Sequence, residues 1–155
     1  MQLLYMDINA ETMRCPCGCA EETAKQRGTG RRALLSDRSK KYPDCCGRYL
    51  DDGEAAPTAE ALMRSRYTAY ALGREDYLLG TWHHSTRPAS LELASKSRNK
   101  WLGLEVRRHE QLEPDNALVE FVARYKVDGR AHRLHEISRF MREAGKWFYI
   151  DGEIL

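Results

Sequence analysis

The sequence predicts an α+β fold in which helices precede an antiparallel sheet. Residues 59–72 carry apolar side chains at the three- and four-residue spacing of a helix that is buried on one face. From residue 101 onward the spacing changes to two, the period of a half-buried strand. In addition, all five cysteines lie between positions 15 and 46, which indicates a small cysteine-rich module ahead of the main domain.

The helix over 59–72 has a signal at each end. Thr58 is a suitable N-cap because its hydroxyl can accept a hydrogen bond from a free backbone N–H of the first turn. Gly73 suits the C-terminal stop, where left-handed backbone is common. A second, shorter helix is predicted from Glu75 to about Trp82, and a brief one over residues 91–97.

Two dipeptides connect the predicted strands. Asp128-Gly129 is a strong signal for a two-residue hairpin, and Ala144-Gly145 is predicted to form a second turn. Strands joined by such short turns must be antiparallel neighbours, which predicts a meander. The predicted strands cover residues 101–109, 117–127, 132–142 and 146–151.

The chain divides into three parts by composition. Residues 1–14 form an N-terminal extension, and residues 15–50 form the cysteine module. A polar, glycine-interrupted loop is inserted in that module at 20–41. Residues 55–155 form the main α+β domain. A chain of 155 residues is long enough for one ordinary domain plus a small metal-nucleated module.

Charge and hydropathy narrow the classes of function. With 25 basic and 23 acidic residues the charge is nearly balanced, which argues against a dedicated nucleic-acid binder and against sequence-specific DNA binding. No apolar run approaches the roughly 20 residues that a membrane helix needs. The N-terminal stretch lacks the basic start and long apolar segment of a secretory signal, so a cytoplasmic location is expected.

The cysteines form two short pairs, Cys15-Pro16-Cys17 and Cys45-Cys46. Thiolates bind zinc tetrahedrally, and two such pairs supply the four ligands of a structural site. We therefore predict a metal site of Cys15, Cys17, Cys45 and Cys46, with zinc as the metal and iron also compatible. Two alternatives stay open: a labile disulfide between vicinal cysteines, and plain buried thiols.

A pocket is a second candidate site. If Asp128-Gly129 is the two-residue loop, Glu136 faces Phe121 and His132 faces Tyr125 on the buried side of the sheet. The same reasoning through Ala144-Gly145 places Ser138 opposite Asp151.

Arg66 lies between Leu62 and Tyr70 on the covered face of the first helix, where it needs a carboxylate partner such as Glu136 or Asp151. The hypothesis is a ligand-binding constellation; the alternative is a structural ion pair inside a filled core. The candidate pocket residues are Arg66, Tyr70, His132, Glu136 and Asp151.

His83 and His84 follow the second helix. They could act as general bases or additional metal ligands. A favourable charge at a helix C-terminus near the surface is the simpler interpretation.

Two sets of motifs resemble known families. The strings CPCG and KYPDCCG resemble the SEC-C motif, a small metal-binding tail of the bacterial translocation ATPase SecA. The strings RSRYTAYALGREDYLLGTW, WLGLEV, FVARY and KWFYIDGE resemble the YchJ family of uncharacterised bacterial proteins. The resemblance implies a SEC-C module with Cys15, Cys17, Cys45 and Cys46 as ligands. It also implies a nuclear-transport-factor-2-like, cystatin-like domain in which a curved antiparallel sheet and helices form a cone.

The sequence departs from the SEC-C pattern at three points. Cys19 stands where the motif usually has serine, and Cys46 stands where the SecA version often has histidine. The stretch between the two pairs is longer than the short hairpin of the family. Longer loops cost little in closure entropy, about 0.6 kcal/mol per doubling, so the site is still expected to form.

The leading functional expectation is a non-enzymatic, zinc-dependent interaction adaptor. By resemblance to SecA tails, its expected partner is the SecB chaperone or the ribosome. The alternative is a small-molecule-binding protein or an enzyme of isomerase or hydrolase type that uses Glu136 or Asp151. A water-accessible cavity lined by Arg66 and these carboxylates would favour the alternative, and a filled cone would favour the adaptor.

Overall fold

The computed structural model describes residues 10–19, 39–96 and 99–155. Its helices come first and its strands follow, so the predicted α+β class is confirmed. The helices are α2 (Gly47–Leu50), α3 (Ala59–Leu72), α4 (Glu75–Gly80) and the 3-10 helix η2 (Leu93–Lys96). The strands are β1 (Asn99–Glu113), β2 (Asn116–Val127), β3 (Arg130–Glu143) and β4 (Lys146–Ile154).

Helix α3 begins and ends where the sequence predicts. The hydroxyl of Thr58 accepts the backbone N–H of Ala61 at 3.0 Å, which satisfies one of the free donors of the first turn. Gly73 has a φ of 71°, left-handed backbone that glycine adopts without steric cost, and it ends the helix.

The four strands form one antiparallel meander in the order β1-β2-β3-β4. Both predicted turns are present, and each has two residues with positive φ: 49° and 79° at Asp128-Gly129, and 50° and 78° at Ala144-Gly145. Two positive φ angles define the turn whose twist matches that of paired strands. A third turn, at Pro114-Asp115 between β1 and β2, was not predicted.

The register of the sheet agrees with prediction on one side of β3 and differs on the other. Phe121 pairs with Glu136, and Tyr125 pairs with His132, as expected. Between β3 and β4 a bulge after Arg139 shifts the pairing, so that Asp151 lies opposite Arg139.

The predicted pairing of Ser138 with Asp151 was therefore wrong by one residue, and Gly152 takes that place. A shift of one residue moves a side chain to the other face of the sheet.

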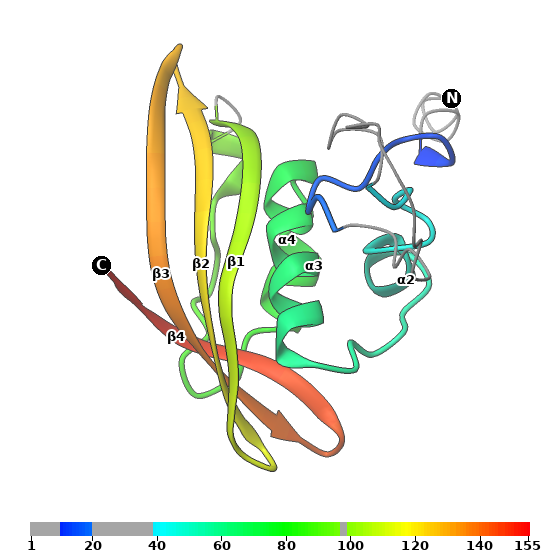
Figure 1. The fold of residues 1–155 in the computed structure, drawn as a ribbon, viewed down its shortest axis with the longest axis vertical. Helices are drawn as coiled ribbons and strands as arrows, with labels where there is room; N and C mark the ends of the chain where they lie inside the picture. Colours follow the sequence, from blue (N-terminus) through cyan, green and yellow to red (C-terminus); the bar gives the residue numbers. More distant parts are fainter. Residues whose placement is uncertain (1–9, 20–38, 97–98) are drawn as a thin grey trace, which may run out of the picture.

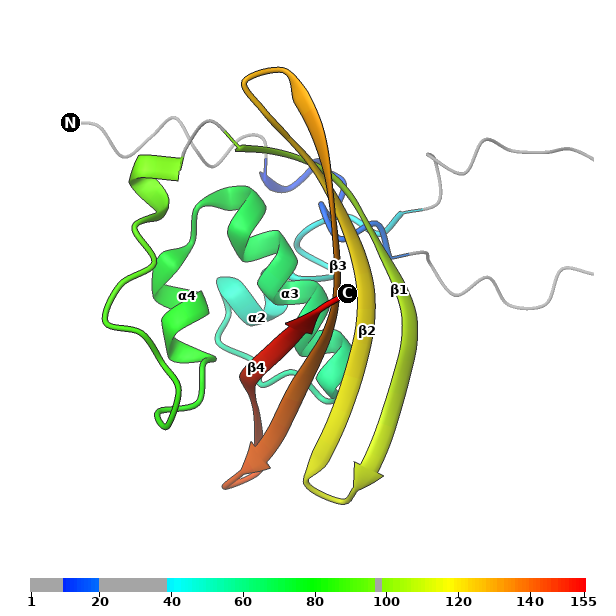
Figure 2. The same cartoon turned by 90° about the vertical axis from the view of Figure 1, so that its left-hand side faces the viewer.

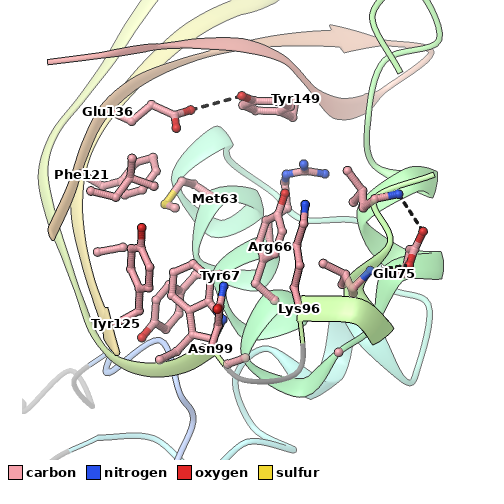
Figure 3. Close-up of a pocket in the computed structure, with 18 of the residues that line it drawn as sticks. Met63, Arg66, Tyr67, Glu75, Lys96, Asn99, Phe121, Tyr125, Glu136 and Tyr149 are labelled. Carbon is pink, nitrogen blue, oxygen red and sulfur yellow. Dashed lines mark hydrogen bonds between the residues drawn. The ribbon is translucent and has the colours of Figure 1, made fainter. Parts of the chain in front are cut away.

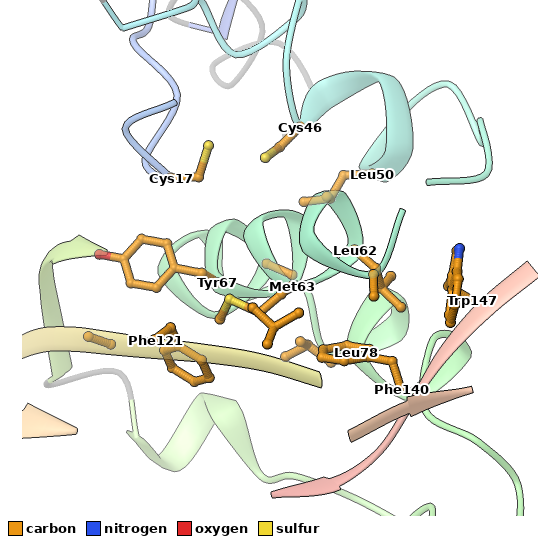
Figure 4. Close-up of a cluster of buried hydrophobic side chains, with 14 of the residues drawn as sticks. Cys17, Cys46, Leu50, Leu62, Met63, Tyr67, Leu78, Phe121, Phe140 and Trp147 are labelled. Carbon is orange, nitrogen blue, oxygen red and sulfur yellow. The ribbon is translucent and has the colours of Figure 1, made fainter. Parts of the chain in front are cut away.

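Helix α3 lies between two layers (Figures 1 and 2). On one side is the concave face of the curved sheet; on the other are α2 and the cysteine-bearing segments. Figure 4 shows Cys17, Cys46 and Leu50 on one side of α3, with Phe121 and Phe140 on the side of the sheet. These residues belong to one continuous apolar core, which joins the cysteine module to the main domain. None of the helices in the described part of the chain combines the length and apolar character that crossing a bilayer requires.

Candidate functional site

Short backbone pairing brings the two cysteine pairs together. Cys15 N–H donates to the carbonyl of Lys40 at 2.9 Å, and Tyr42 N–H donates to the carbonyl of Met13 at 2.8 Å. Between these bonds Arg14 and Lys41 form an antiparallel bridge. The pairing therefore begins ahead of Cys15 and includes the last part of the predicted 20–41 loop. Residues 20–38 of that loop, and residues 1–9 of the extension, lie outside the described residues.

A tight turn then presents Cys45 and Cys46. The carbonyl of Tyr42 accepts the N–H of Cys45 at 3.1 Å and that of Gly47 at 2.8 Å. A side chain at Gly47 would place its Cβ 2.8 Å from that same carbonyl oxygen, so the turn requires glycine. Gly18 closes the other pair: its N–H donates to the carbonyl of Cys15 at 3.0 Å, at a φ of 66°.

The four predicted ligands lie together. The Sγ atoms of Cys15, Cys17, Cys45 and Cys46 are all within 4.8 Å of one another. Cys17 and Cys45 are 3.6 Å apart, and Cys45 and Cys46 are 3.9 Å apart. Tetrahedral zinc with Zn–S bonds of about 2.3 Å requires neighbouring sulfurs roughly 3.8 Å apart. These are spacings of shared metal ligands, far longer than the ~2.05 Å of a disulfide, and the cysteines of the described part are free.

The electrostatics of the cluster favour a cation. Hydrogen bonds from its neighbours, first of all Cys17, lower the pKa of the Cys15 thiol. The same contact with Cys15 raises the pKa values of Cys17, Cys45 and Cys46. Four adjacent thiolates repel one another, so the sulfurs must keep protons or share a positive ion. A divalent metal removes this conflict, and the four residues fit that role.

The cluster is closed and rests on α3. Cys15, Cys17 and Cys46 are at most 3% exposed. The Sγ of Cys15 is 3.7 Å from the hydroxyl of Thr68, and the guanidinium of Arg64 donates to the carbonyl of Cys17 at 3.3 Å.

Sequence reasoning missed Thr68 and Arg64. The signal that could have found them is the composition of α3. The buried residues of this helix include polar ones, so the middle of the helix has no solvent-facing side. Cys19 is half-buried and its sulfur is outside the group of four, although its carbonyl accepts the N–H of Lys40 at 3.0 Å.

A cavity of about 660 Å³ lies between α3, η2 and the concave face of the sheet. Figure 3 shows side chains from all three elements pointing into it. Its volume falls in the range of small-molecule pockets. Most of the lining is apolar or aromatic, as in Met63, Tyr67, Tyr70, Trp101, Phe121 and Tyr125.

Arg66 is the buried cation of this cavity, only 5% exposed. One guanidinium nitrogen, Nη1, donates to the carbonyl of Leu78 and to the hydroxyl of Thr81, both at 2.7 Å. The guanidinium carbon lies 4.5 Å from the ring centre of Tyr149 and 5.1 Å from that of Trp82.

No carboxylate of the described residues lies within ion-pair distance of Arg66. The predicted ion pair with Glu136 or Asp151 is therefore wrong, because a carbonyl, a hydroxyl and two aromatic rings surround the charge instead. Burial lowers the pKa of Arg66, but an arginine keeps its proton at neutral pH.

Glu136 is the acidic group on the sheet side of the cavity; Glu75, which also lines it, accepts hydrogen bonds from the backbone N–H groups of Leu91 and Leu93. The Oε1 of Glu136 accepts a hydrogen bond from the hydroxyl of Ser138 at 2.8 Å. It accepts a second from the hydroxyl of Tyr149 at 3.2 Å (Figure 3). The side chain passes directly over Gly152, where any Cβ would overlap with the carboxylate. Burial, and then the charge of Glu136, raise the pKa of Tyr149, so this hydroxyl stays a donor.

The structure brings Arg66, Tyr70 and Glu136 together at the cavity and leaves two predicted members out. Asp151 is partly exposed and pairs with Arg139 on the outer face, because the bulge places the two residues opposite each other. His132 is exposed and stacks on Tyr125, with ring centres 5.2 Å apart, near the end of the β2–β3 hairpin. Tyr149 was missed, although the Ala144-Gly145 turn already places it opposite Phe140, on the turn side of the bulge.

His83 is buried, contrary to the expected surface position, while His84 is exposed. Both ring nitrogens of His83 have partners: Nδ1 contacts the hydroxyl of Ser85 at 2.6 Å, and Nε2 contacts the carboxylate of Glu143 at 2.7 Å. These contacts anchor the side chain of His83, and the ligand atoms of His83, His84 and Glu143 lie within 4.8 Å of one another.

Comparison with known proteins identifies the family that has this architecture. A family model described as "YchJ, middle NTF2-like domain" matches residues 58–152, which include α3, α4, η2 and nearly all of the sheet. The chain belongs to the YchJ family. A UPF0225 protein of Polaromonas naphthalenivorans is 51% identical over 141 residues, which cover 91% of this chain and 98% of that protein. Another, from Methylibium petroleiphilum, is 59% identical over 113 residues, 73% of this chain and 82% of the relative.

Two solved structures described as SEC-C motif containing proteins are similar to this YchJ-family chain. The one from Rhodopseudomonas palustris has a TM-score of 0.69 and 34% identity, and the match covers 77% of this chain and 95% of that one. The one from Psychrobacter arcticus has a TM-score of 0.70 and 27% identity, covering 94% and 85%. The chain thus combines a SEC-C motif, whose cysteines could hold a metal ion, with an NTF2-like domain.

Proposed function

We propose that the chain is a zinc-dependent protein-interaction adaptor whose cysteine site is structural. The observation that supports this is a set of four sulfur donors, all from the protein and three of them buried. Catalytic zinc sites keep one position open for water or substrate, whereas structural sites are filled by protein ligands. Four thiolates suit zinc, and iron is the alternative metal for the same ligands.

When bound, zinc would supply a charge-neutralising cross-link between two chain segments that are joined by the long 20–38 stretch. Cys15 and Cys17 belong to the first segment, Cys45 and Cys46 to the second. The second segment is also tied to the start of α4, because Arg74, the residue just before that helix, donates to the carbonyl of Leu50 at 3.0 Å. The site would thereby fix the outer layer of the molecule against the NTF2-like domain.

That outer layer is the surface we assign to the partner. It lies on the side of α3 away from the sheet (Figure 1), and Lys41, Asp44 and Arg48 are exposed on it. A polar, charged surface on a metal-fixed scaffold suits a non-obligate partner. By resemblance to the tails of SecA, the proposed partner is the SecB chaperone or the ribosome.

The test compares a double variant, Cys45→Ser with Cys46→Ser, against Cys19→Ser as the matched control. Elemental analysis should find one zinc per chain in the parent and in the control, and less than a tenth of that in the double variant. Binding to purified SecB and to ribosomes is measured by co-sedimentation. Unchanged metal in the double variant contradicts the site; absence of binding to both partners contradicts the adaptor.

A second candidate function is small-molecule binding or turnover in the cavity. The observation that favours it is the open space that contains Arg66 and Glu136 without an ion pair between them. Of the predicted pair, Glu136 lines this space, and its Oε2 accepts no hydrogen bond from the described residues, so isomerase or hydrolase chemistry here is assigned to its carboxylate. The other acidic residue of the lining, Glu75, is held by the backbone N–H groups of Leu91 and Leu93.

A further inference from the structure

The cavity has an unsatisfied cation. Arg66 uses Nη1 for both of its hydrogen bonds, and neither Nη2 nor Nε has a hydrogen-bond partner among the described residues. No side-chain nitrogen or oxygen of the described residues is both inaccessible and without a partner, so these two donors are accessible to water or to a ligand. The residue itself lines the cavity. A buried guanidinium with two free donors is the arrangement that recognises a planar anion such as a carboxylate.

The guanidinium is held in place before any ligand arrives. Its carbon lies over the rings of Tyr149 and Trp82, and its Nη1 is fixed by Leu78 and Thr81. A charge fixed in this way loses little side-chain entropy on binding. Lys96, from η2, lines the same cavity and adds a second positive charge.

The aromatic residues that line the cavity indicate what kind of group the ligand carries besides its anion. Trp101, Phe121 and Tyr125 present aromatic rings to the space. The ring centres of Trp101 and Tyr125 are 5.2 Å apart, so they form one continuous aromatic surface. Such a surface favours a flat aromatic body over a chain of hydroxyls.

Glu136 adds one polar requirement. Its Oε1 accepts from Ser138 and Tyr149, whereas its Oε2 accepts no hydrogen bond from the described residues. A ligand N–H or O–H could donate a hydrogen bond to this Oε2. Because Glu136 is acidic, an anionic group on the ligand must lie at the Arg66 end and not at this one.

We propose that the cavity binds an aromatic carboxylic acid that carries an N–H or O–H donor, with its carboxylate on Arg66 and its donor on Glu136. This inference rests on the second candidate function and is independent of the cysteine site. It names the class of ligand, and the two charged groups fix the direction in which that ligand lies.

The experiment uses the full chain, with indole-3-propanoate as the probe and its neutral amide as the matched compound. Isothermal titration calorimetry should show saturable binding of the acid, and at least tenfold weaker binding of the amide. Arg66→Gln should weaken the acid at least tenfold and leave the amide nearly unchanged. Arg133→Gln, an exposed arginine on β3, is the control and should bind as the parent does.

A second variant covers the case in which Arg66→Gln does not fold. Leu134 is half-buried and lines the cavity, so Leu134→Trp should place an indole ring inside it, obstruct the ligand and abolish binding of both compounds. Equal affinity for acid and amide would overturn the carboxylate assignment while preserving the cavity as a binding site. No saturable binding of either compound at millimolar concentration, or binding that survives in Leu134→Trp, would overturn the cavity function as well.

Discussion

Replacing Gly152 by alanine is expected to displace the carboxylate of Glu136 and to lower the stability of the domain. The new Cβ would lie 2.9 Å from Cγ of Glu136 and closer still to its carboxylate. The carboxylate must therefore leave the hydroxyls of Ser138 and Tyr149. Ser138 is 2% exposed, so its hydroxyl would be left without an acceptor in a buried place.

The magnitude follows from these contacts. A hydrogen bond to a charged acceptor contributes ~1.5–3 kcal/mol, and the half-buried position of Glu136 favours the lower end of that range. The longer bond from Tyr149 adds less than that from Ser138, which gives about 2 kcal/mol for the pair. Alanine in a strand recovers ~0.5–1 kcal/mol relative to glycine, so the net loss is about 1–1.5 kcal/mol.

Gly103 offers the matched control, because it also lies in a strand and a Cβ built there meets nothing within 4 Å. Gly103→Ala should leave stability unchanged or raise it slightly. Urea unfolding followed by tryptophan fluorescence gives the free energy of unfolding of both variants at neutral pH. If Gly152→Ala is as stable as Gly103→Ala, the carboxylate network has no energetic role, and the account of Glu136 is refuted.

Further predictions concern the helices that carry the site. Leu78→Ala should lower the free energy of unfolding by ~3 kcal/mol, because Leu78 is fully buried. Leu102→Ala should change it by less than ~0.5 kcal/mol, because Leu102 is 46% exposed. Urea unfolding measures the free energy of both variants. Thr58→Ala should cost ~1 kcal/mol through loss of the α3 N-cap, and Thr58→Ser should restore it. Backbone N–H groups, first of all that of Leu91, lower the pKa of Glu75 below its ordinary 4.5. The stability that this carboxylate contributes is therefore present above that pH and is lost as the pH falls through the lower folded value. Glu75→Gln should flatten the acid limb of the stability-against-pH curve, and an unchanged limb would contradict the assigned bonds.

The parts of the fold that are encoded locally could be predicted from the sequence. Thr58 and Gly73 define the ends of α3 because capping depends on neighbouring residues alone. Asp128-Gly129 defines the β2–β3 register because a two-residue turn fixes which residues are opposite. The same applies to the cysteines, whose two pairs are short and stand beside turn-forming glycines.

The parts that depend on tertiary packing could not be predicted. The bulge after Arg139 has no sequence signal in this chain, yet it places Asp151 opposite Arg139 and so turns it outward. The partners of Arg66 also come from packing, since Thr81 and the ring of Trp82 meet it only once α4 is docked. From the sequence alone, a buried arginine is expected to have a carboxylate partner. In the structure, the charge of Arg66 is surrounded by a carbonyl, a hydroxyl and two aromatic rings instead.

X-ray absorption at the zinc edge of the purified protein tests whether the four cysteines bind the metal. The four-cysteine site predicts four sulfur neighbours at about 2.3 Å from the metal and no nitrogen or oxygen neighbour. The spectrum of Cys19→Ser should be the same, because the sulfur of Cys19 lies outside the group of four. A nitrogen or oxygen neighbour in the parent protein, or a ligand lost in Cys19→Ser, would contradict the assignment of Cys15, Cys17, Cys45 and Cys46 as the closed metal site.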